Sequence, residues 1–535
     1  MSKIFYPDFF NDVFGPIMQP GSSSSFAGNS RVGHAASFTI KGKLKRAKIR
    51  FNLSDKGRIR KLGNMMEDRA FLGGLQGFAT DDERLFKSHE LARENKISYE
   101  FGALDKDTPY PGSVCFDLES DKGEKGRLIG ASIGGGMILI SEINGFPVEW
   151  QGDSNALFFK PGVVQSKIDT LIKHQGSAVL AQKILKSASG EEARFVEFSE
   201  LPAEKDLENF APEEFLVYRA LLPVVSFNGR QPQLFKNVDE WIAYAEAKHI
   251  SFVEAAIAYE KAFSGWDEKR IWAYFEHIRD ILLNQIHALE DQGIDPVPDT
   301  PLLPVYGKQW NRYKKSGKVL QDSLTSRIMD YAFSVNAKIP GVKIVPGPMG
   351  TGGGYLFSAL EGVREARGLT RQKQLEGLAV AAGLGAIAFS NCHASGASGC
   401  VGESGICCAM ASGAITWMAG GTGQQVQHAA SMALQANIGI PCDPIPGGLE
   451  FPCLTRTVRA AVTAPLYADM ALSGIDPLIP YHEVLHAIEH TRNLYPEAIC
   501  GADCGTNCTP TAEKCQRFLS GEVMEGKMRW EAAAS

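Results

Sequence analysis

The sequence predicts a multidomain α+β protein, and three observations support this fold class. A chain of 535 residues is longer than a single hydrophobic core usually allows, so we expect about two to four domains. Residues 1–150 mix short strands with helices, whereas apolar residues from Val238 onward recur at the three- and four-residue spacing of helices. We therefore expect an N-terminal α/β domain over 1–150, a small α+β unit over 151–205, a linker over 206–235 and an all-α domain over 236–520.

Short apolar runs predict the strands of the N-terminal domain. Residues 46–53, 112–118 and 136–143 have the length and apolar content of strands, whereas residues 88–96 have helical spacing. This mixture of short elements is the basis for assigning residues 1–150 to an α/β domain.

A serine-rich turn in this domain is a candidate binding site. Residues 20–28 read Pro-Gly-Ser-Ser-Ser-Ser-Phe-Ala-Gly, and a predicted helix follows at residues 31–36. Small hydroxyls and backbone N–H groups that precede a helix can bind an anion or a carboxylate. The same composition is typical of a flexible linker, so both interpretations stay open. A glycine-rich turn, Gly134 to Gly136, is compatible with a tight turn alone.

Residues 151–205 are predicted to form a separate small unit. Residues 158–172 indicate a strand, a Pro-Gly turn and a helix, and residues 193–199 indicate a later strand. Residues 206–235 are rich in proline and glutamate and lack a clear period, which indicates a linker.

The C-terminal part is predicted to be helical, except at one glycine-rich loop. Residues 343–355 read Lys-Ile-Val-Pro-Gly-Pro-Met-Gly-Thr-Gly-Gly-Gly-Tyr. They are not a P-loop, because no Gly-Lys-Ser/Thr follows. Glycines such as Gly352 and Gly353 allow either the close approach of a ligand or a plain connection between helices.

The composition excludes some classes of function. The formal net charge is −6, which gives no electrostatic case for binding nucleic acid or an anionic membrane surface. The start of the chain lacks the apolar core of a signal peptide. The longest apolar stretches, residues 377–389 and 406–417, are too short to span a bilayer and are predicted to be buried helices. We therefore expect a cytoplasmic protein that acts on a small molecule.

The cysteines are concentrated in the C-terminal part of the chain. Of the eleven cysteines, only Cys115 lies outside residues 392–515, a distribution that points to metal or redox chemistry. Cys400, Cys442 and Cys453 stand in turns rich in glycine or proline. Three thiolates are one fewer than the usual ligands of an iron–sulfur cluster and would leave one iron open to substrate. The simpler interpretation is that these cysteines are small buried residues.

The segments around these cysteines resemble the iron–sulfur-dependent bacterial L-serine dehydratases. The run Cys-Val-Gly-Glu-Ser-Gly from Cys400 is similar to that family's Cys-x-Gly-Glu-x-Gly segment. The run from Cys442 to Cys453 is similar to its Cys-Asp-Pro and Pro-Cys segment. Further similarity covers most of the chain: residues 22–31, 68–84 and 134–146 resemble the family's β part, residues 159–164 weakly resemble an ACT-type module, and residues 237–293 resemble the start of its α part.

This resemblance implies a single chain that fuses a serine dehydratase β-type domain, an ACT-like module and an all-α cluster-binding domain. It implies that Cys400, Cys442 and Cys453 hold a [4Fe–4S] cluster, whose open iron assists loss of the substrate hydroxyl, and that no PLP is needed. It also implies substrate binding by the serine-rich turn and the glycine-rich loop, a displaceable cluster ligand from the tail, and a homodimer. The residues concerned are Ser22, Ser23, Ser24, Ser25, Gly352 and Gly353 for the substrate, and Cys500, Cys504, Cys508 and Cys515 for the tail.

The sequence departs from the family pattern at residues expected to face the substrate. Met65 stands where the family has the histidine expected to act as the base, and Ser25 stands where it usually has another histidine. Methionine cannot accept a proton, so another residue must serve if the chemistry is retained. The replacement candidates are His34, Glu67 and His393, although a packing or solvated role is the simpler interpretation of each.

Three functions remain open from the sequence. The first is dehydration and deamination of L-serine to pyruvate and ammonium. The second keeps the cluster but changes the substrate, to a hydroxymethyl dicarboxylic acid or to cysteine with loss of sulfide. The third is a sensing protein whose cluster does not catalyse. Turnover of a panel of β-substituted acids separates the first from the second, and a ligand-induced change at the open iron separates both from the third.

Overall fold

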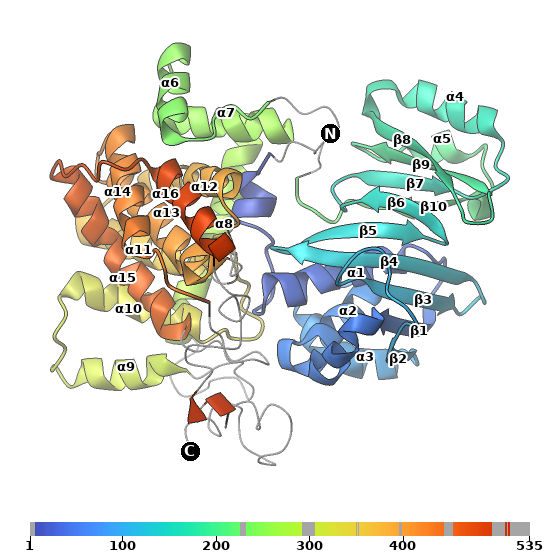
Figure 1. Cartoon of the computed structure of the whole chain (residues 1–535), viewed down its shortest axis with the longest axis horizontal. Helices are drawn as coiled ribbons and strands as arrows, with labels where there is room; N and C mark the ends of the chain where they lie inside the picture. The colour runs from blue at the N-terminus through green and yellow to red at the C-terminus, as the bar shows by residue number, and fades with distance from the viewer. Residues whose placement is uncertain are drawn as a thin grey trace. The chain divides into compact units, whose positions relative to one another are not determined.

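The computed structural model divides the chain into two compact units (Figure 1). The sheet unit comprises Gly21–Arg230, and the helical unit comprises Met1–Pro20 together with Gln231–Ser535. This division confirms a mixed α+β protein with an N-terminal sheet region and a mainly helical C-terminal region. The structure describes residues 6–224, 232–291, 305–348, 350, 352–394, 398–442, 453–494, 509–510 and 512–513, without the side chains of residues 60, 61, 64 and 65.

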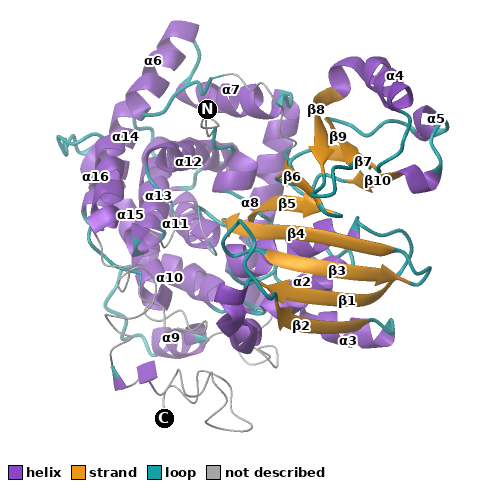
Figure 2. Ribbon diagram, turned by 45° about the vertical axis from the view of Figure 1, so that its right-hand side comes forward, coloured by secondary structure: helices purple, strands orange, loops and turns teal. Residues whose placement is uncertain are grey.

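The sheet unit begins with a six-stranded sheet covered by helices (Figure 2). Its strand order is β2-β1-β3-β4-β5-β6, with β1 and β2 parallel and the other pairs antiparallel. The strands are β1 (Leu44–Phe51), β2 (Ser98–Ala103), β3 (Val114–Ser120), β4 (Lys125–Gly134), β5 (Met137–Ile143) and β6 (Phe146–Trp150), and the helices are α1 (Asn29–Ser37), α2 (Glu67–Leu75) and α3 (Ser88–Glu94).

Close backbone packing joins α1 to α2 above this sheet. A Cβ atom on Gly33 would lie 2.6 Å from the Phe71 carbonyl oxygen, and one on Gly74 would lie 2.0 Å from the Ser30 carbonyl oxygen. Only glycine permits so close an approach. The apolar side chains of both helices share one core with the sheet strands, so the serine-rich turn that leads into α1 has a fixed base.

A second sheet follows in the sheet unit, and it includes residues that the sequence analysis assigned to a linker. Its elements run β7 (Asn155–Phe159), α4 (Gln165–Gln175), β8 (Val179–Lys186), β9 (Glu192–Phe198), α5 (Glu204–Leu207) and β10 (Phe215–Tyr218), with strand order β10-β7-β9-β8. This is the βαββαβ ferredoxin-like arrangement. Whether the module is of the ACT type stays a prediction.

The last strand of this sheet explains why the linker prediction for residues 206–235 differs from the structure. β10 pairs antiparallel with β7, and Phe215 packs 6.2 Å from the ring of Phe159, which also packs against Phe210. The proline and glutamates that suggested a linker form a short turn, Pro212–Glu214, directly before this strand. Long-range packing of aromatic residues therefore orders a segment that has no clear local period.

The helical unit is built around two buried central helices (Figure 1). Both predicted apolar stretches lie in them: residues 377–389 in α12 and residues 406–417 in α13. Small residues allow close packing here, since a Cβ atom on Gly413 would lie 2.4 Å from the Leu384 side chain. The helices are α6 (Val238–Lys248), α7 (Phe252–Ser264), α8 (Glu268–Asp291), α9 (Tyr306–Lys315), α10 (Ser323–Asn336), α11 (Gly352–Arg367), α12 (Arg371–Asn391), α13 (Ser404–Met418), α14 (Gly423–Gln435), α15 (Cys453–Leu472) and α16 (Tyr481–Leu494).

The start of the chain packs in the helical unit, whereas the sequence analysis placed it with residues 1–150. Tyr6 donates a hydrogen bond to the Tyr259 carbonyl oxygen at 3.1 Å, and the Phe9 N–H donates to the Glu260 carboxylate at 2.9 Å. Phe9 and Phe10 are fully buried, and Phe9 stacks on the Tyr259 ring. These long-range aromatic contacts give no local sequence signal. In the part of the chain that is described, no helix is long and apolar enough to cross a membrane.

Candidate functional site

Cys400 is held in a tight turn that only glycine could precede. Gly399 has φ 84°, and a Cβ atom there would lie 2.5 Å from the Ile440 carbonyl oxygen. The Cys400 N–H donates to the same carbonyl oxygen at 2.9 Å. Its buried thiol lies 2.9 Å from the hydroxyl of Ser404, the first residue of α13. The turn therefore brings Cys400 directly against the segment that ends at Cys442.

The segments of the other two predicted ligands are joined to this turn. Cys442 is buried and follows Ile440 and Pro441, whereas Cys453 is half-buried and is the first residue of α15. One turn further along α15, Arg456 donates a hydrogen bond to the Pro441 carbonyl oxygen at 2.8 Å. Two hydrogen bonds thus connect the three chain segments that carry Cys400, Cys442 and Cys453.

The three thiols are the predicted ligands of a cluster, and the structure allows a limited test of their arrangement. Among the described residues, no group of three or more His, Cys, Asp or Glu side chains could hold a metal ion. A [4Fe–4S] cluster has a different requirement, because each thiolate binds a different iron on a separate side of the cluster. Cys400, Cys442 and Cys453 lie on three hydrogen-bonded segments, and their binding of a cluster stays a prediction. The tail cysteines Cys500, Cys504, Cys508 and Cys515 lie outside the described residues.

Burial opposes ionisation of the Cys400 thiol in the metal-free chain. Burial raises the pKa of Cys400 above its ordinary value, although the Ser404 hydroxyl and the Arg456 guanidinium act in the opposite direction. The thiolate is the form that binds metal. A positively charged iron centre would therefore supply the stabilisation that burial removes, in addition to that from Arg456.

The glycine-rich loop packs tightly on itself and against α13. A Cβ atom on Gly352 would lie 2.5 Å from the Gly347 carbonyl oxygen, and one on Gly353 would lie 2.5 Å from the Val345 carbonyl oxygen. The Cys407 thiol of α13 donates to the Gly352 carbonyl oxygen at 3.3 Å. Close backbone packing thus accounts for both glycines, and a role in binding the substrate stays a prediction.

Asn336 connects this loop to the helix that begins at Cys453. Its side-chain amide donates to the Tyr355 hydroxyl of α11 at 3.1 Å and to the Leu454 carbonyl oxygen of α15 at 3.0 Å. Asn336 is fully buried. The first turns of α11 and α15 are therefore held together, so the glycine-rich loop and Cys453 lie in the same part of the helical unit.

The serine-rich turn packs against the glycine-rich turn from Gly134 to Gly136. Ser22 caps the short helical turn η2 (Ser23–Gly28), its hydroxyl accepting from the Ser25 N–H at 3.2 Å. The Ser132 hydroxyl of β4 donates to the Ser24 carbonyl oxygen at 2.9 Å. Arg31 donates to the Gly136 carbonyl oxygen at 2.7 Å. These contacts replace the flexible-linker interpretation with a fixed turn.

Ser23 keeps hydrogen-bonding capacity within this turn. Its hydroxyl is buried, and the described structure gives it no hydrogen-bond partner. The Ser25 N–H is already used by Ser22. A carboxylate at this turn would therefore find its clearest protein donor at Ser23.

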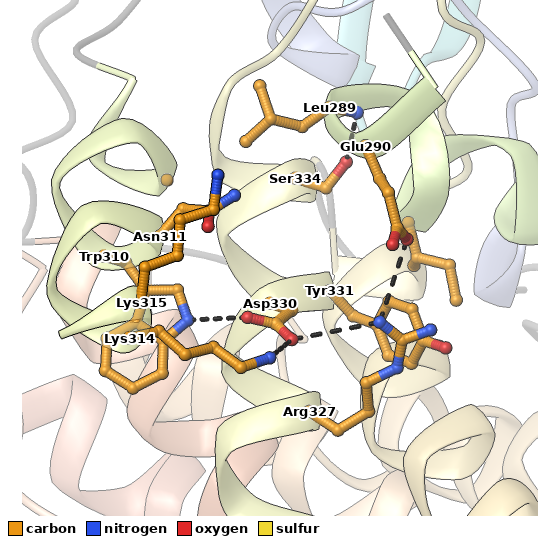
Figure 3. Close-up of a pocket in the computed structure, with 12 residues that line it drawn as sticks. Leu289, Glu290, Trp310, Asn311, Lys314, Lys315, Arg327, Asp330, Tyr331 and Ser334 are labelled. Carbon is orange, nitrogen blue, oxygen red and sulfur yellow. Dashed lines mark hydrogen bonds and ion pairs between the residues drawn. The ribbon is translucent and has the colours of Figure 1, made fainter. Parts of the chain in front are cut away.

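A separate cavity of about 470 Å³ lies between α8, α9 and α10 of the helical unit (Figure 3). The Trp310 indole donates to Asp330 at 2.8 Å, Lys314 also pairs with Asp330, and Arg327 lies 3.7 Å from Glu290. Its charged groups therefore largely balance each other. None of the predicted site residues lines this cavity.

Comparison with known proteins identifies the family of the chain. The family model described as "Serine dehydratase alpha chain" matches residues 236–506. The chain is 31% identical over 299 residues to the "Probable L-serine dehydratase, alpha chain" of Bacillus subtilis, a match that covers 54% of this chain and 97% of that relative. The chain belongs to the L-serine dehydratase family.

Other members of the L-serine dehydratase family show how its parts are distributed. The "L-serine dehydratase, beta chain" of Peptoniphilus asaccharolyticus is 32% identical over 150 residues, which covers 28% of this chain and 66% of that relative. The "L-serine dehydratase 1" of Escherichia coli is 27% identical over 268 residues, which covers 49% of this chain and 58% of that relative. This member of the family is a lyase that joins alpha-chain and beta-chain similarity in one polypeptide.

The contacts of Glu67, His34 and His393 do not identify any of these three candidates as the base of this L-serine dehydratase family member. Glu67 is engaged by Arg58 through two hydrogen bonds of 2.7 and 2.9 Å. Burial lowers the pKa of His34, whose ring packs 5.2 Å from Phe38. Burial and the nearby Arg492 also lower the pKa of His393. The histidines are thus biased toward the neutral form that a base needs, but their role stays a prediction.

One polar constellation escaped the sequence analysis. His89 of α3 lies with Nε2 2.8 Å from the Asp68 carboxylate of α2 and with Nδ1 2.7 Å from the Tyr99 hydroxyl of β2. A carboxylate that orients a histidine is the arrangement used for proton transfer. Because the three residues lie on separate elements, no local sequence motif identifies them. The side chain of Met65, three residues before Asp68, lies outside the described residues.

Proposed function

We propose that this L-serine dehydratase family member converts L-serine to pyruvate and ammonium with a [4Fe–4S] cluster held by Cys400, Cys442 and Cys453. Family membership supports the reaction. The observation that carries the cluster is the pair of hydrogen bonds, from Cys400 to Ile440 and from Arg456 to Pro441, that joins the three cysteine segments. When bound, such a cluster supplies an open iron that acts as a Lewis acid toward the substrate hydroxyl.

The residues of the chain have three tasks in this reaction. The cysteines hold the cluster, and the buried surroundings of Cys400 and Cys442 keep water away from their thiols. Ser23 of the serine-rich turn is the preferred donor for the substrate carboxylate, because its hydroxyl is buried and has no partner in the described structure. A base removes the α-proton as the β-hydroxyl leaves, and the resulting enamine hydrolyses to the keto acid and ammonium.

A second proposal is a dehydratase for another β-hydroxy acid, and the sequence at the substrate-facing positions favours it. Met65 cannot act as a base, and Ser25 replaces a residue type that could. The cluster would be retained while substrate recognition changed. A hydroxymethyl dicarboxylic acid is one such substrate, losing water. Cysteine is a separate alternative, in which elimination releases sulfide in place of water.

Anaerobic turnover tests the proposed function. The full chain is reconstituted with iron and sulfide, its iron content is measured, and pyruvate formation from L-serine is followed alongside a panel of β-substituted acids. Pyruvate from L-serine supports the first proposal. An iron-loaded protein that is silent with L-serine but turns over another acid supports the second, and an iron-loaded protein silent with all of them points to a sensor.

A further inference from the structure

Arg456 occupies a special position among the three cysteine segments. It lies three residues after Cys453 on α15, so both side chains leave the helix on the same side. Its guanidinium donates to the Pro441 carbonyl oxygen at 2.8 Å, directly before Cys442. The Cys400 N–H donates to the Ile440 carbonyl oxygen, the residue before Pro441, so Cys400 packs on the segment that Arg456 binds. One side chain therefore joins the helix of Cys453 to the segment of Cys442, on which Cys400 packs.

The neighbouring contacts show that this position is fixed. The Cys400 N–H binds the Ile440 carbonyl oxygen at 2.9 Å, so the carbonyls of two consecutive residues are held, one by Cys400 and one by Arg456. The first turn of α15 is held in turn by Asn336, through the Leu454 carbonyl oxygen. The guanidinium thus binds a backbone segment that is itself hydrogen-bonded to the Cys400 turn.

A guanidinium at this position would compensate the charge of a bound cluster. Three thiolates around a [4Fe–4S] core leave a net negative charge in a largely buried site, and burying charge without compensation is costly. A guanidinium remains protonated at every physiological pH and can donate in two directions at once. The ammonium of a lysine would retain the charge but not the planar fork.

We propose that Arg456 is the positioning residue of the cluster site: its guanidinium joins the helix of Cys453 to the segment of Cys442, on which Cys400 packs, and offsets the negative charge of the bound thiolates. The inference rests on the cluster of the proposed function but not on the identity of the substrate. It assigns Arg456 to the surroundings of the cluster, since it acts through the cysteines and does not replace one of them.

Three variants of the full chain test this inference after anaerobic reconstitution. Arg456→Gln removes the charge, and Arg456→Lys keeps the charge but loses the fork. Arg459→Gln is the matched control, because Arg459 lies on the same helix and binds the Asn437 side chain. Iron per chain, the rate of iron loss to a chelator, the EPR spectrum of the reduced cluster and its reduction potential are measured, together with thermal unfolding of the metal-free protein.

We expect Arg456→Gln to hold iron roughly tenfold more weakly, as changes next to metal ligands commonly do, and to shift the reduction potential to more negative values. Arg456→Lys should keep the potential close to that of the unaltered protein while losing iron faster. Arg459→Gln should match the unaltered protein in both. Metal-free Arg456→Gln should unfold within a few degrees of the unaltered protein, so that iron loss reports on the cluster.

Unchanged iron retention and potential in Arg456→Gln would overturn the inference while leaving the proposed function in place. If the unaltered chain takes up no iron, the cluster itself is refuted and the inference falls with it. Should Arg456→Gln fail to fold, Arg456→Lys decides: faster iron loss with an altered EPR spectrum supports the inference, and values identical to the unaltered protein contradict it.

Discussion

Gly399 controls the placement of the Cys400 thiol through its backbone. Its positive φ and the 2.5 Å approach of a hypothetical Cβ atom to the Ile440 carbonyl oxygen both require glycine. The position of this predicted ligand therefore depends on a residue with no side chain. The sequence marks this glycine only as part of a glycine-rich run, since the partner carbonyl lies on a distant segment.

The change Gly399→Ala is expected to destabilise the helical unit by about 1–3 kcal/mol and to reduce iron uptake. The added methyl group must push the Cys400 turn away from the Cys442 segment. Denaturant unfolding and iron analysis measure both effects. Gly420→Ala is the control, because Gly420 also has a positive φ but no atom lies within 4 Å of the point that an added methyl group would occupy. Full iron uptake by Gly399→Ala would contradict this account of the turn.

The pairing of Asp68 with His89 predicts a dependence of stability on pH. Burial by itself would raise the pKa of Asp68, but hydrogen bonds from His89 and from the Arg69 backbone, together with the charges of both residues, outweigh burial and lower the pKa. A lowered carboxyl pKa contributes stability above the ordinary value of about 3.9, and this contribution is lost as the pH falls through the lower folded value.

The change His89→Gln should therefore lower the unfolding free energy of the sheet unit by about 1 kcal/mol near pH 6. The difference from the unaltered protein should shrink as the pH falls below about 4, where Asp68 becomes protonated in both. Urea unfolding at a series of pH values measures this. A difference that stays constant down to the lowest pH would show that the Asp68 carboxylate contributes nothing through His89.

The N-terminal segment from Tyr6 to Pro20 is an element of the helical unit, although the sequence separates it from that unit by the whole sheet unit. Its aromatic residues fill space between α7 and α8: Phe9 stacks on Tyr259, and Phe10 packs against Tyr274 and Phe275. Met18 and Ile344 also exchange backbone hydrogen bonds. The segment thus closes the core of the unit that carries the cysteines.

We expect truncation of a buried side chain in this N-terminal segment to lower the stability of the helical unit strongly. Phe10→Ala should lower the unfolding free energy of the helical unit by about 3–5 kcal/mol, as expected for a fully buried phenylalanine. Leu320→Ala is the control, since Leu320 is 93% exposed and its truncation should change little. Differential scanning calorimetry measures both. Equal melting temperatures for Phe10→Ala and Leu320→Ala would show that the segment does not stabilise the helices.

For the molecule as a whole, local patterns in the sequence predict the elements well and their grouping less well. Long apolar runs predict α12 and α13 to be buried helices, because a helix that is buried on every side needs apolar residues on every side. Local patterns do not predict the packing of residues 6–20 and 215–218, because distant aromatic partners decide where they pack.

Sequence patterns likewise point to some residues of the candidate site and miss others. The sequence names Cys400, Cys442 and Cys453 as candidate ligands, since they stand in glycine- and proline-rich turns and their segments resemble those of a family. Arg456 and the Asp68, His89 and Tyr99 constellation are not named, because each acts through a contact between separate elements. Residues expected to bind a metal or a substrate occur in recognisable sequence motifs. Residues that position them are recognised only from contacts in the structure.

If Cys400, Cys442 and Cys453 hold a cluster that dehydrates L-serine, activity must depend on bound iron and on each of these cysteines. The most direct measurement follows pyruvate formation from L-serine in one anaerobic sample as prepared, after removal of iron, and after reconstitution, with Cys442→Ser treated in parallel. The account predicts activity that disappears with the iron and returns on reconstitution, and a Cys442→Ser protein that neither binds the cluster nor forms pyruvate. Pyruvate formation that survives complete removal of iron, or that Cys442→Ser retains in full, would contradict it.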